Sequence, residues 1–316
     1  MIDIIKTAVG KFIKEDSEII ENYNNYGIRA IDKKVIDRKI KKLTKSSIDF
    51  SVHIPNLIVS LTSFPQRMYD LHYTLYSLMT QSISPSKVIL WLSKEEFPNG
   101  IESIPQNVRA FIKFGLGIEW VETNLKPYNK LIHALKKYPD AILATADDDI
   151  YYTHTWLEGL YKDYATHGNK YIYAYRTHRI KYENSLLASY DKWDKEIQGN
   201  TPSLLNFATG VGGVLYPAGV LHQDVTNEKQ FFRLTPTSDD IWFWGMAVMN
   251  GIKIKVVLGF DGLVYINPER ELRLNGEYTL SQENVINKSN DYQLRQIIDE
   301  YSIEDILKTN SSGVEI

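Results

Sequence analysis

One stretch of ten residues, 141–150, constrains the fold more than any other part of the chain. It consists of Ala-Ile-Leu-Ala-Thr-Ala-Asp-Asp-Asp-Ile, an apolar run that leads directly into three aspartates. Such a run is typical of a central strand in a parallel sheet, which is covered on both faces. In open α/β sheets, ligands bind at the carboxyl ends of the strands, where these acids would lie. The stretch therefore predicts an α/β fold with a site at the end of this strand.

The three adjacent carboxylates, Asp147, Asp148 and Asp149, need a nearby positive charge because like charges so close together repel one another. Mg²⁺ and Mn²⁺ bind carboxylate oxygens, so a metal site is the simplest interpretation. The alternative is a solvated acidic turn in which Asp149 or Thr153 caps the helix that follows.

Strand-like and helix-like segments alternate in the part of the chain that leads to these acids. Apolar runs predict strands at residues 57–62, 87–93, 118–121 and 141–146, and helical periodicity predicts helices at 71–79, 108–114 and 128–138. This alternation indicates βαβ units and a mostly parallel sheet flanked by helices. We expect this domain to span residues 55–268, between a helical N-terminal extension (1–54) and a C-terminal helical segment and tail (269–316).

The N-terminal extension contains two stretches with apolar residues at helical spacing, within residues 2–13 and at 31–43. Residues 31–45 carry seven lysines and arginines but only two acids, Asp32 and Asp37. A basic amphipathic helix of this kind is able to bind an anionic membrane surface. It is equally typical of a helix that packs on the main domain and exposes its lysines to solvent.

Composition excludes several classes of protein. The 316-residue chain has a formal net charge of −3, which argues against a general nucleic-acid-binding protein. It has no cysteine, so disulfides, thiolate metal sites and a cysteine nucleophile are excluded. No apolar run has the length of a membrane span, and the N-terminus does not resemble a secretory signal. We expect a cytoplasmic protein, with residues 31–45 as its one candidate for peripheral attachment to the membrane.

A second stretch with candidate catalytic residues spans residues 235–251. Ser238 or Asp239 is placed to cap a helix that ends at Gly251, which accounts for one of the adjacent acids Asp239 and Asp240 but not for both. A carboxylate at a helix N-terminus is kept ionised by the helix dipole, as a general base requires. Upstream, the glycines within 210–213 either let the backbone approach a bulky ligand or mark a bulged strand. Residues 171–179 predict a strand with a polar end, whereas residues 182–206 show no pattern and are a candidate loop over the substrate.

Four segments, in this order, resemble the glycosyltransferases of the GT-A fold: Leu-Ile-Val-Ser-Leu-Thr-Ser-Phe-Pro at 57–65, Ala-Asp-Asp-Asp-Ile at 146–150, Gly-Val-Gly-Gly at 210–213 and Ser-Asp-Asp-Ile-Trp at 238–242. They look closest to the bacterial family-2-like enzymes that build surface polysaccharides, over about residues 55–265. The resemblance implies an inverting transfer from a nucleotide-sugar donor, by family habit a UDP-sugar, with Mn²⁺ or Mg²⁺. The acceptor would be a hydroxyl of a growing, lipid-linked glycan. The Gln/Arg-rich signature that usually follows the acidic pair is replaced here by Ile-Trp-Phe-Trp at 241–244.

The resemblance also implies roles for individual residues. The nucleoside would be contacted by Thr62, Ser63 and Phe64. Asp147 would contact the ribose or the metal, and the principal metal ligand would be Asp149, with Asp148 as the other candidate. The general base would be Asp240, or else Asp239, and the donor sugar and the acceptor would be bordered by Gly210, Gly212 and Gly213. Cationic side chains are further candidates for the diphosphate, with Lys130 preferred over Arg67, Arg176 and Arg179. Arg176 and Trp242 are also candidates for contact with the sugar or acceptor.

Other functions stay open. A sugar nucleotidyltransferase has a similar sheet with paired acids and Mg²⁺, but it usually has a Gly-rich basic loop where this chain has Ser-Phe-Pro-Gln at 63–66. A metal-dependent phosphohydrolase or nuclease usually has acids on several early strands, and the first strand here ends without one. The non-enzymatic alternative is a catalytically inactive, carbohydrate-binding domain of the same fold.

Overall fold

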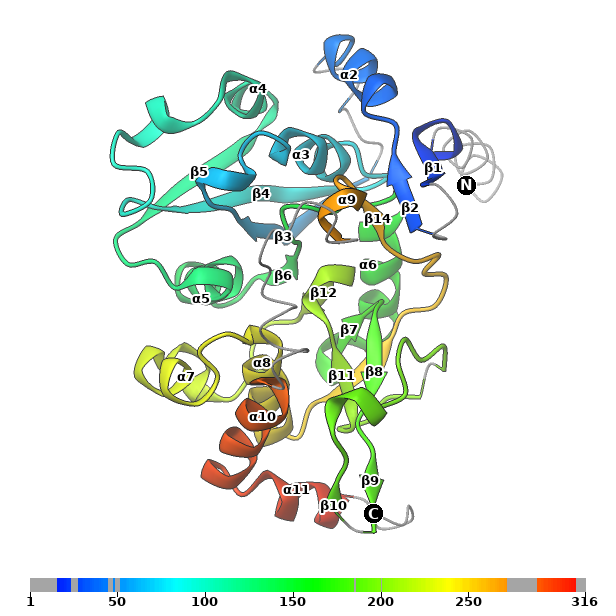
Figure 1. Ribbon diagram of the computed structural model, residues 1–316, viewed down its shortest axis with the longest axis vertical. Helices are drawn as coiled ribbons and strands as arrows, with labels where there is room; N and C mark the ends of the chain where they lie inside the picture. The colour runs from blue at the N-terminus through cyan, green and yellow to red at the C-terminus, as the bar shows by residue number, and fades with distance from the viewer. Residues whose placement is uncertain are drawn as a thin grey trace. The chain divides into compact units, whose positions relative to one another are not determined.

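A computed structural model of the chain describes residues 16–23, 28–44, 48, 52–184, 186–199, 201–271 and 289–310. The chain divides into two compact units (Figure 1). Unit 1 comprises Met1–Asn124, Asp147–Glu158 and Asp261–Glu277, and unit 2 comprises Leu125–Ala146, Gly159–Phe260 and Tyr278–Ile316. The helix predicted within residues 2–13 lies outside the described residues.

Unit 1 is built on three parallel strands: β3 (His53–Thr62), β4 (Ser84–Ser93) and β5 (Leu116–Val121), with β4 in the middle. Helix α3 (Leu71–Met79) connects β3 to β4 and packs against β4. Between β4 and β5 lie two 3₁₀ turns, Gly100–Ser103 and Ile112–Phe114, and the short α4 (Gln106–Arg109). Leu57, Val59 and Leu61 of β3 are fully buried, as a strand covered on both faces requires. These elements confirm the strands predicted at 57–62, 87–93 and 118–121.

A second, small sheet in unit 1 brings together segments that are far apart in sequence. Strand β1 (Ile20–Tyr23) pairs antiparallel with β2 (Ile28–Ile31), and β2 pairs in parallel with β14 (Val264–Tyr265). Helix α2 (Lys33–Lys41) follows β2, and the short α9 (Pro268–Glu271) follows β14. Strands of two to four residues are too short for a periodic pattern, which is why the sequence did not indicate them.

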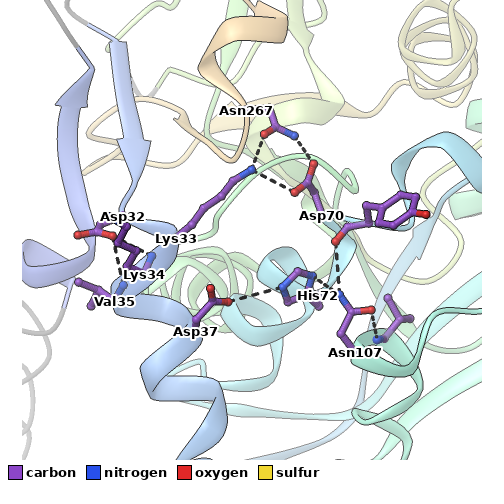
Figure 2. A network of polar contacts seen from close by, with 11 residues as sticks. Asp32, Lys33, Lys34, Val35, Asp37, Asp70, His72, Asn107 and Asn267 are labelled. Atoms are coloured by element: carbon purple, nitrogen blue, oxygen red, sulfur yellow. Dashed lines mark hydrogen bonds and ion pairs between the residues drawn. The ribbon is translucent and has the colours of Figure 1, made fainter.

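A polar network fixes the start of α2 to the rest of unit 1 (Figure 2). The ammonium of Lys33 donates hydrogen bonds to Asp70 Oδ1 (3.1 Å) and Asn267 Oδ1 (2.6 Å). Asn267 donates in turn to the other carboxylate oxygen of Asp70. Asp32 caps the helix by accepting from the backbone N–H of Lys34 at 2.8 Å. One of the seven predicted surface cations, Lys33, is therefore a packing residue.

The same network continues to α3 and α4 (Figure 2). Asn107 of α4 lies 2.9 Å from His72 Nδ1, and His72 Nε2 lies 3.9 Å from Asp37 of α2. Burial lowers the pKa of His72 below its ordinary value, so the contact with Asp37 is not an ion pair at neutral pH. Helix α2 therefore packs on unit 1, and its exposed cations are Lys34, Arg38, Lys41 and Lys42.

Unit 2 has four strands in the order β13 (Lys253–Val256), β7 (Tyr171–Ala174), β12 (Val214–Tyr216) and β6 (Ile142–Thr145). β13 is parallel to β7, whereas β12 is antiparallel to both of its neighbours. Helix α5 (Asn129–Lys137), preceded by a 3₁₀ turn at Lys126–Tyr128, leads into β6. Helix α6 (Trp156–His167) and the 3₁₀ turn Gly168–Lys170 lead into β7.

The segment 171–179, predicted as one strand, bends at Tyr175 and Arg176. Its second half is β8 (Thr177–Arg179), which pairs antiparallel with β11 (Asn206–Ala208). Residues 182–206, which the sequence left without a pattern, contain the hairpin β9 (Tyr182–Glu183) and β10 (Leu186–Leu187) and the 3₁₀ turn Tyr190–Lys192. Trp193 is only 4% exposed, so this segment is anchored in unit 2.

The remaining helices of unit 2 gather around α8 (Asp239–Met249): α7 (Glu228–Leu234), α10 (Ser289–Glu300) and α11 (Ile303–Asn310) (Figure 1). Further 3₁₀ turns lie at Gly210–Gly212 and Gln223–Thr226. A Cβ atom at Gly245 would lie 2.3 Å from Ile297, so the glycine allows α10 to pack directly on α8. Gly251 follows the end of α8 with a left-handed φ of +67°, as predicted for a C-terminal glycine.

The protein is therefore an α/β protein whose main sheet has three strands in unit 1 (β3, β4 and β5) and four in unit 2 (β13, β7, β12 and β6), flanked by helices. Of the five pairings of these seven strands within the units, three are parallel, in agreement with the mostly parallel sheet that the sequence predicts. Among the described helices, none has the length and apolar character needed to cross a membrane.

Candidate functional site

The three aspartates of unit 1, which we call the acidic turn (Asp147–Asp149), are held by side chains of unit 1. The hydroxyl of Thr74 lies 2.9 Å from the carbonyl oxygen of Asp148 and 3.0 Å from that of Ile150. The backbone N–H of Asp147 donates to the phenolic oxygen of Tyr152 at 2.7 Å. These three backbone groups therefore have partners within unit 1, which hold the turn in place.

Arg67 forms ion pairs with two aspartates of the acidic turn. Its Nη1 atom lies 2.6 Å from Asp148 Oδ1 and 2.6 Å from Asp149 Oδ2. Ser63 donates its hydroxyl to the other oxygen of Asp148 at 2.6 Å. The side chain of Asp148 is only 7% exposed, and both of its oxygens are occupied. The residues directly after β3 thus bind the acidic turn, and Asp148 acts as a structural residue.

Asp149 keeps more exposure than Asp148, and its negative charge is incompletely balanced. Its side chain is 28% exposed and pairs with Arg67, so it does not cap α6, which begins only at Trp156. The pKa of Asp149 is raised to about 6, mainly by burial, with Asp148 and Asp147 adding to the effect against the opposing charges of Arg67 and Arg270. The acidic turn therefore favours additional positive charge.

This donor set fits a divalent cation that shares its coordination with a ligand. Among the described residues, no group of three His, Asp or Glu side chains is placed to hold a metal ion by itself. Mg²⁺ in phosphate-transfer sites commonly takes one or two carboxylates and completes its coordination with substrate phosphates and water. Asp149, with Asp147 beside it, supplies carboxylates of that kind.

Two other residues predicted to contact the nucleoside lie at the end of β3 and just after it. Thr62 donates its hydroxyl to the carbonyl oxygen of Trp91 at 2.9 Å, so this group is used within the sheet. Phe64 is one of the exposed large apolar residues, and the guanidinium of Arg67 lies 5.3 Å from its ring centroid. Phe64 therefore has a surface that a base is able to contact.

The second acidic pair, in unit 2, opens helix α8. Asp239 and Asp240 are its first two residues, where the helix dipole favours negative charge. Lys130, in the first turn of α5, places its ammonium 3.1 Å from Asp239 Oδ2. That oxygen is buried and receives no hydrogen bond from the described residues, so the contact is an ion pair without hydrogen-bond geometry. Asp239 and Lys130 are both nearly inaccessible.

Asp240 is held by the glycine-containing turn instead. The backbone N–H of Gly210 donates to Asp240 Oδ1 at 3.0 Å. A Cβ atom at position 210 would lie 2.9 Å from Asp240 Oδ1 and 2.9 Å from Lys130 Nζ, closer than real Cβ atoms approach. Glycine at this position therefore lets the turn, the Lys130 ammonium and the Asp240 carboxylate meet without a shift of either side chain. We call Lys130, Asp239, Asp240 and Gly210 the helix-start cluster.

Arg176 lies against the same turn. A Cβ atom at Gly212 would be 2.6 Å from Arg176 Cβ and 2.9 Å from its backbone nitrogen, so glycine permits this approach too. Arg176 donates to Glu196 Oε1 (2.9 Å) and to Thr209 Oγ1 (3.0 Å). Gly213 has φ +92°, a conformation that favours glycine. The glycines at 210, 212 and 213 thus allow close approach and turning of the backbone.

Trp242 does not lie where a sugar-contacting residue is expected. Its side chain is fully buried, its indole N–H donates to the carbonyl oxygen of Val225 at 2.9 Å, and it packs on Phe231 and Tyr301. Its position is that of a core residue, and the expectation of a sugar or acceptor contact is not supported. Conversely, Tyr190, Lys195 and Glu196 surround Arg176 without having been indicated by the sequence, because their segment has no periodic pattern.

No protein-family model matches the sequence, and no curated protein matches it. Solved structures similar to this chain include 2-C-methyl-D-erythritol 4-phosphate cytidylyltransferase from Francisella tularensis, with 13% identity, a TM-score of 0.42 and coverage of 70% of this chain and 98% of that chain. Residues 1–349 of TarS from S. aureus, in complex with UDP-GlcNAc, show 16% identity, a TM-score of 0.44 and coverage of 67% of this chain and 58% of that chain. The 4-diphosphocytidyl-2C-methyl-D-erythritol synthase from Anaerococcus prevotii DSM 20548 shows 13% identity, a TM-score of 0.41 and coverage of 69% and 95%. Likeness at this level does not define the reaction or the substrate of this chain.

Proposed function

We propose that this protein is a glycosyltransferase that moves a sugar from a nucleoside-diphosphate donor to a hydroxyl group of a glycan. The observation that carries the proposal is the helix-start cluster: Asp240 accepts a backbone hydrogen bond from Gly210, beside the buried pair of Lys130 and Asp239. A carboxylate at a helix N-terminus with a fixed orientation suits a general base. The sequence resemblance to GT-A glycosyltransferases supports the same assignment.

In the proposed reaction, Asp240 removes the proton of the acceptor hydroxyl while its oxygen attacks the anomeric carbon from the face opposite the diphosphate. The bond between that carbon and the diphosphate oxygen breaks, so the product glycoside is inverted and the nucleoside diphosphate departs. Asp239 holds its charge against Lys130 and is therefore less suited to accept a proton. The pair thus divides into one reacting and one positioning carboxylate.

The acidic turn is proposed to bind the donor. When bound, Mn²⁺ or Mg²⁺ at Asp149 and Asp147 supplies positive charge to the diphosphate. Arg67 and Ser63 keep the turn in place through Asp148, and Phe64 presents an apolar surface to the nucleoside base. Uridine is proposed as the base from the sequence resemblance alone. A lipid-linked surface glycan at the cytoplasmic face of the membrane is the proposed acceptor.

Product analysis distinguishes this proposal from the alternatives. Purified protein is incubated with a panel of nucleotide sugars and Mn²⁺, and in parallel with nucleoside triphosphates and sugar 1-phosphates. Release of nucleoside diphosphate from a nucleotide sugar supports the glycosyltransferase. Release of pyrophosphate from the triphosphate mixtures would show a nucleotidyltransferase instead. Sugar binding without either product would show a carbohydrate-binding domain.

A further inference from the structure

Arg176 and Lys195 bring two positive charges together in unit 2. Arg176 lies in the bend between β7 and β8 and is fixed by Glu196 at 2.9 Å and by Thr209 at 3.0 Å. The pKa of Lys195 is lowered to about 8, first by burial and next by the charge of Arg176, against opposing effects of Asp191 and Asp291, so Arg176 and Lys195 lie within electrostatic reach of each other. With Glu196 as the paired carboxylate, the three side chains carry a net formal charge of +1.

The Lys195 side chain is held by aromatic rings. Its ammonium lies 3.3 Å from the ring centroid of Tyr190 and 5.6 Å from that of Trp193, and it donates to the carbonyl oxygen of Tyr190. Among the described residues, none of the ion pairs includes Lys195, although the residue is exposed. A cation stacked on rings and left without a carboxylate in contact is able to take an external anion.

The segment that carries Lys195 is firmly attached to β8. Ile197 donates its backbone N–H to the carbonyl oxygen of Thr177 at 2.9 Å, and the N–H of Glu196 donates to His178 Nδ1 at 3.0 Å. Glu196 has φ +50°, a strained conformation for a residue with a side chain. These bonds hold Glu196 and Lys195 in place beside Arg176.

This pair of cations lies close to the proposed base. Arg176 touches Gly212, and the same turn donates from Gly210 to Asp240. The pKa of Tyr190 indicates that Arg176 and Asp240 both lie near this ring. Burial raises this pKa to about 12, the charge of Arg176 opposes the rise, and the charge of Asp240 adds to it. The ring that carries Lys195 is therefore within electrostatic reach of both Arg176 and Asp240.

We propose that Arg176 and Lys195 form a subsite for one anionic group of the acceptor, a carboxylate or a phosphate close to the hydroxyl that reacts. The inference rests on the proposed function and names its acceptor class: an acidic sugar or a phosphate-bearing glycan rather than a neutral one. Arg176 supplies planar, directional donors, and Lys195 supplies a mobile point charge. An anion in this place balances the net formal charge of +1 that Arg176, Lys195 and Glu196 carry together.

Pyridoxal 5′-phosphate tests the subsite without knowledge of donor or acceptor. Its aldehyde condenses with a lysine amine to an imine with loss of water, and borohydride reduces the imine to a stable secondary amine. Its phosphate is the anion that Arg176 would bind. We expect Lys195 to be labelled about tenfold faster by pyridoxal 5′-phosphate than by pyridoxal, the factor that one charge-assisted hydrogen bond supplies. Peptide mass spectrometry locates the label.

Lys192 is the matched control, because it lies in the same segment and pairs with Glu183 at the surface. Pyridoxal is held mostly as its internal hemiacetal, so the ratio of the two labelling rates at Lys192 gives the intrinsic difference between the reagents, and the tenfold preference of Lys195 is counted after division by this ratio. Arg176→Gln should remove the preference at Lys195 but leave its reaction with pyridoxal. A labelling ratio at Lys195 no higher than that at Lys192 in the native protein, or no labelling of Lys195, would overturn the subsite.

Competition identifies the source of the anion. Protection of Lys195 by D-glucuronate, with D-glucose ineffective, indicates a carboxylate, and protection by inorganic phosphate alone indicates a phosphate. Protection by uridine diphosphate where neither anion protects would place the two cations on the donor and contradict the acceptor assignment. Because the labelling needs neither metal nor catalysis, loss of transferase activity in the product assay would leave this result standing on its own.

Discussion

Lys130 and Asp239 form a buried ion pair in which the ammonium lies 3.1 Å from the carboxylate oxygen, with side chains 7% and 11% exposed. This contact separates two acids that are adjacent in sequence. Asp239 forms an ion pair with Lys130, whereas Asp240 accepts a hydrogen bond from the backbone N–H of Gly210. Because of this difference, we assign a structural role around α8 to Asp239 and the role of general base to Asp240.

The first prediction concerns the stability of this pair. Asp239→Asn replaces the carboxylate that pairs with the buried Lys130 ammonium by a neutral amide, and we expect the free energy of unfolding to fall by about 3–5 kcal/mol. Asp240→Asn, at the more accessible position, should cost only about 1 kcal/mol. Urea denaturation of both variants measures the difference. The double variant Lys130→Met, Asp239→Leu removes both charges and should recover much of the loss. Equal, small effects for the two asparagine variants would contradict the assignment.

The second prediction concerns the glycine turn. In Gly212→Ala, the new methyl group meets the backbone of Arg176, which is unable to move aside, so we expect about 1–3 kcal/mol of destabilisation. In Gly210→Ala, the methyl group meets the ends of the Asp240 and Lys130 side chains, which are able to shift. Transfer activity should therefore fall more than stability does.

Gly199→Ala is the matched control for both glycine variants, because nothing lies within 4 Å of the position of its new methyl group. It should behave like the wild-type protein in thermal unfolding and in the transfer assay. If Gly210→Ala kept full activity, the contact between the turn and Asp240 would be irrelevant to the reaction.

The third prediction concerns pH. His178 is buried, and burial together with the charges of Arg176 and Lys195 lowers its pKa from 6.5 to about 3. The unfolded chain binds a proton at this residue below pH 6.5 that the folded protein does not, so the stability contribution is complete above pH 6.5 and is lost as pH falls toward 3. In His178→Asn, the amide Oδ1 takes the place of Nδ1 as the acceptor of the Glu196 N–H, and the acid-side slope of unfolding free energy against pH should flatten. An unchanged slope would show that His178 does not titrate in this way.

The fourth prediction concerns the membrane. Deleting the N-terminal extension would remove β2 and the Lys33 network along with the exposed cations, so charge reversal is the cleaner test. If α2 binds anionic lipid, Lys34→Glu, Arg38→Glu, Lys41→Glu should weaken binding to phosphatidylserine vesicles by about 10²-fold or more, since each of the three cations near such a surface contributes about 1 kcal/mol. Vesicle co-sedimentation measures the effect.

A control with the same change in charge uses exposed lysines away from α2: Lys113→Glu, Lys170→Glu, Lys229→Glu. This variant should retain vesicle binding if the helix itself makes the contact. Equal loss in both variants would indicate that only net charge matters, and no loss in either would show that α2 does not attach the protein to the membrane.

Patterns in the sequence predicted the strands that are covered on both faces. The apolar runs at 57–62 and 87–93 became β3 and β4 because strands covered on both faces need such runs. The segment 171–179 was predicted as one strand, but it bends at Arg176 where Gly212 and Thr209 contact this residue. Periodicity does not record contacts between segments so far apart along the chain.

The sequence predicted which types of residue form the candidate site, but not which side chains pair with one another. The two acidic stretches and the glycines at 210 and 212 were visible as motifs. That Arg67 pairs with Asp148, and Lys130 with Asp239, depends on side chains brought together from different elements. Trp242 shows the converse: this aromatic residue, two positions after the acidic pair, fills the core, because α8 is apolar on nearly every side.

Asp240→Asn tests most directly whether Asp240 is the base of a sugar transfer. Nucleoside diphosphate release is measured from the nucleotide sugar that the product assay identifies, with nucleotide binding measured in parallel by calorimetry. We predict that release falls by about 10²–10⁴-fold, the contribution of a general base, while nucleotide binding stays at the wild-type level. Release at the wild-type rate from a folded, nucleotide-binding Asp240→Asn variant would contradict this role for Asp240.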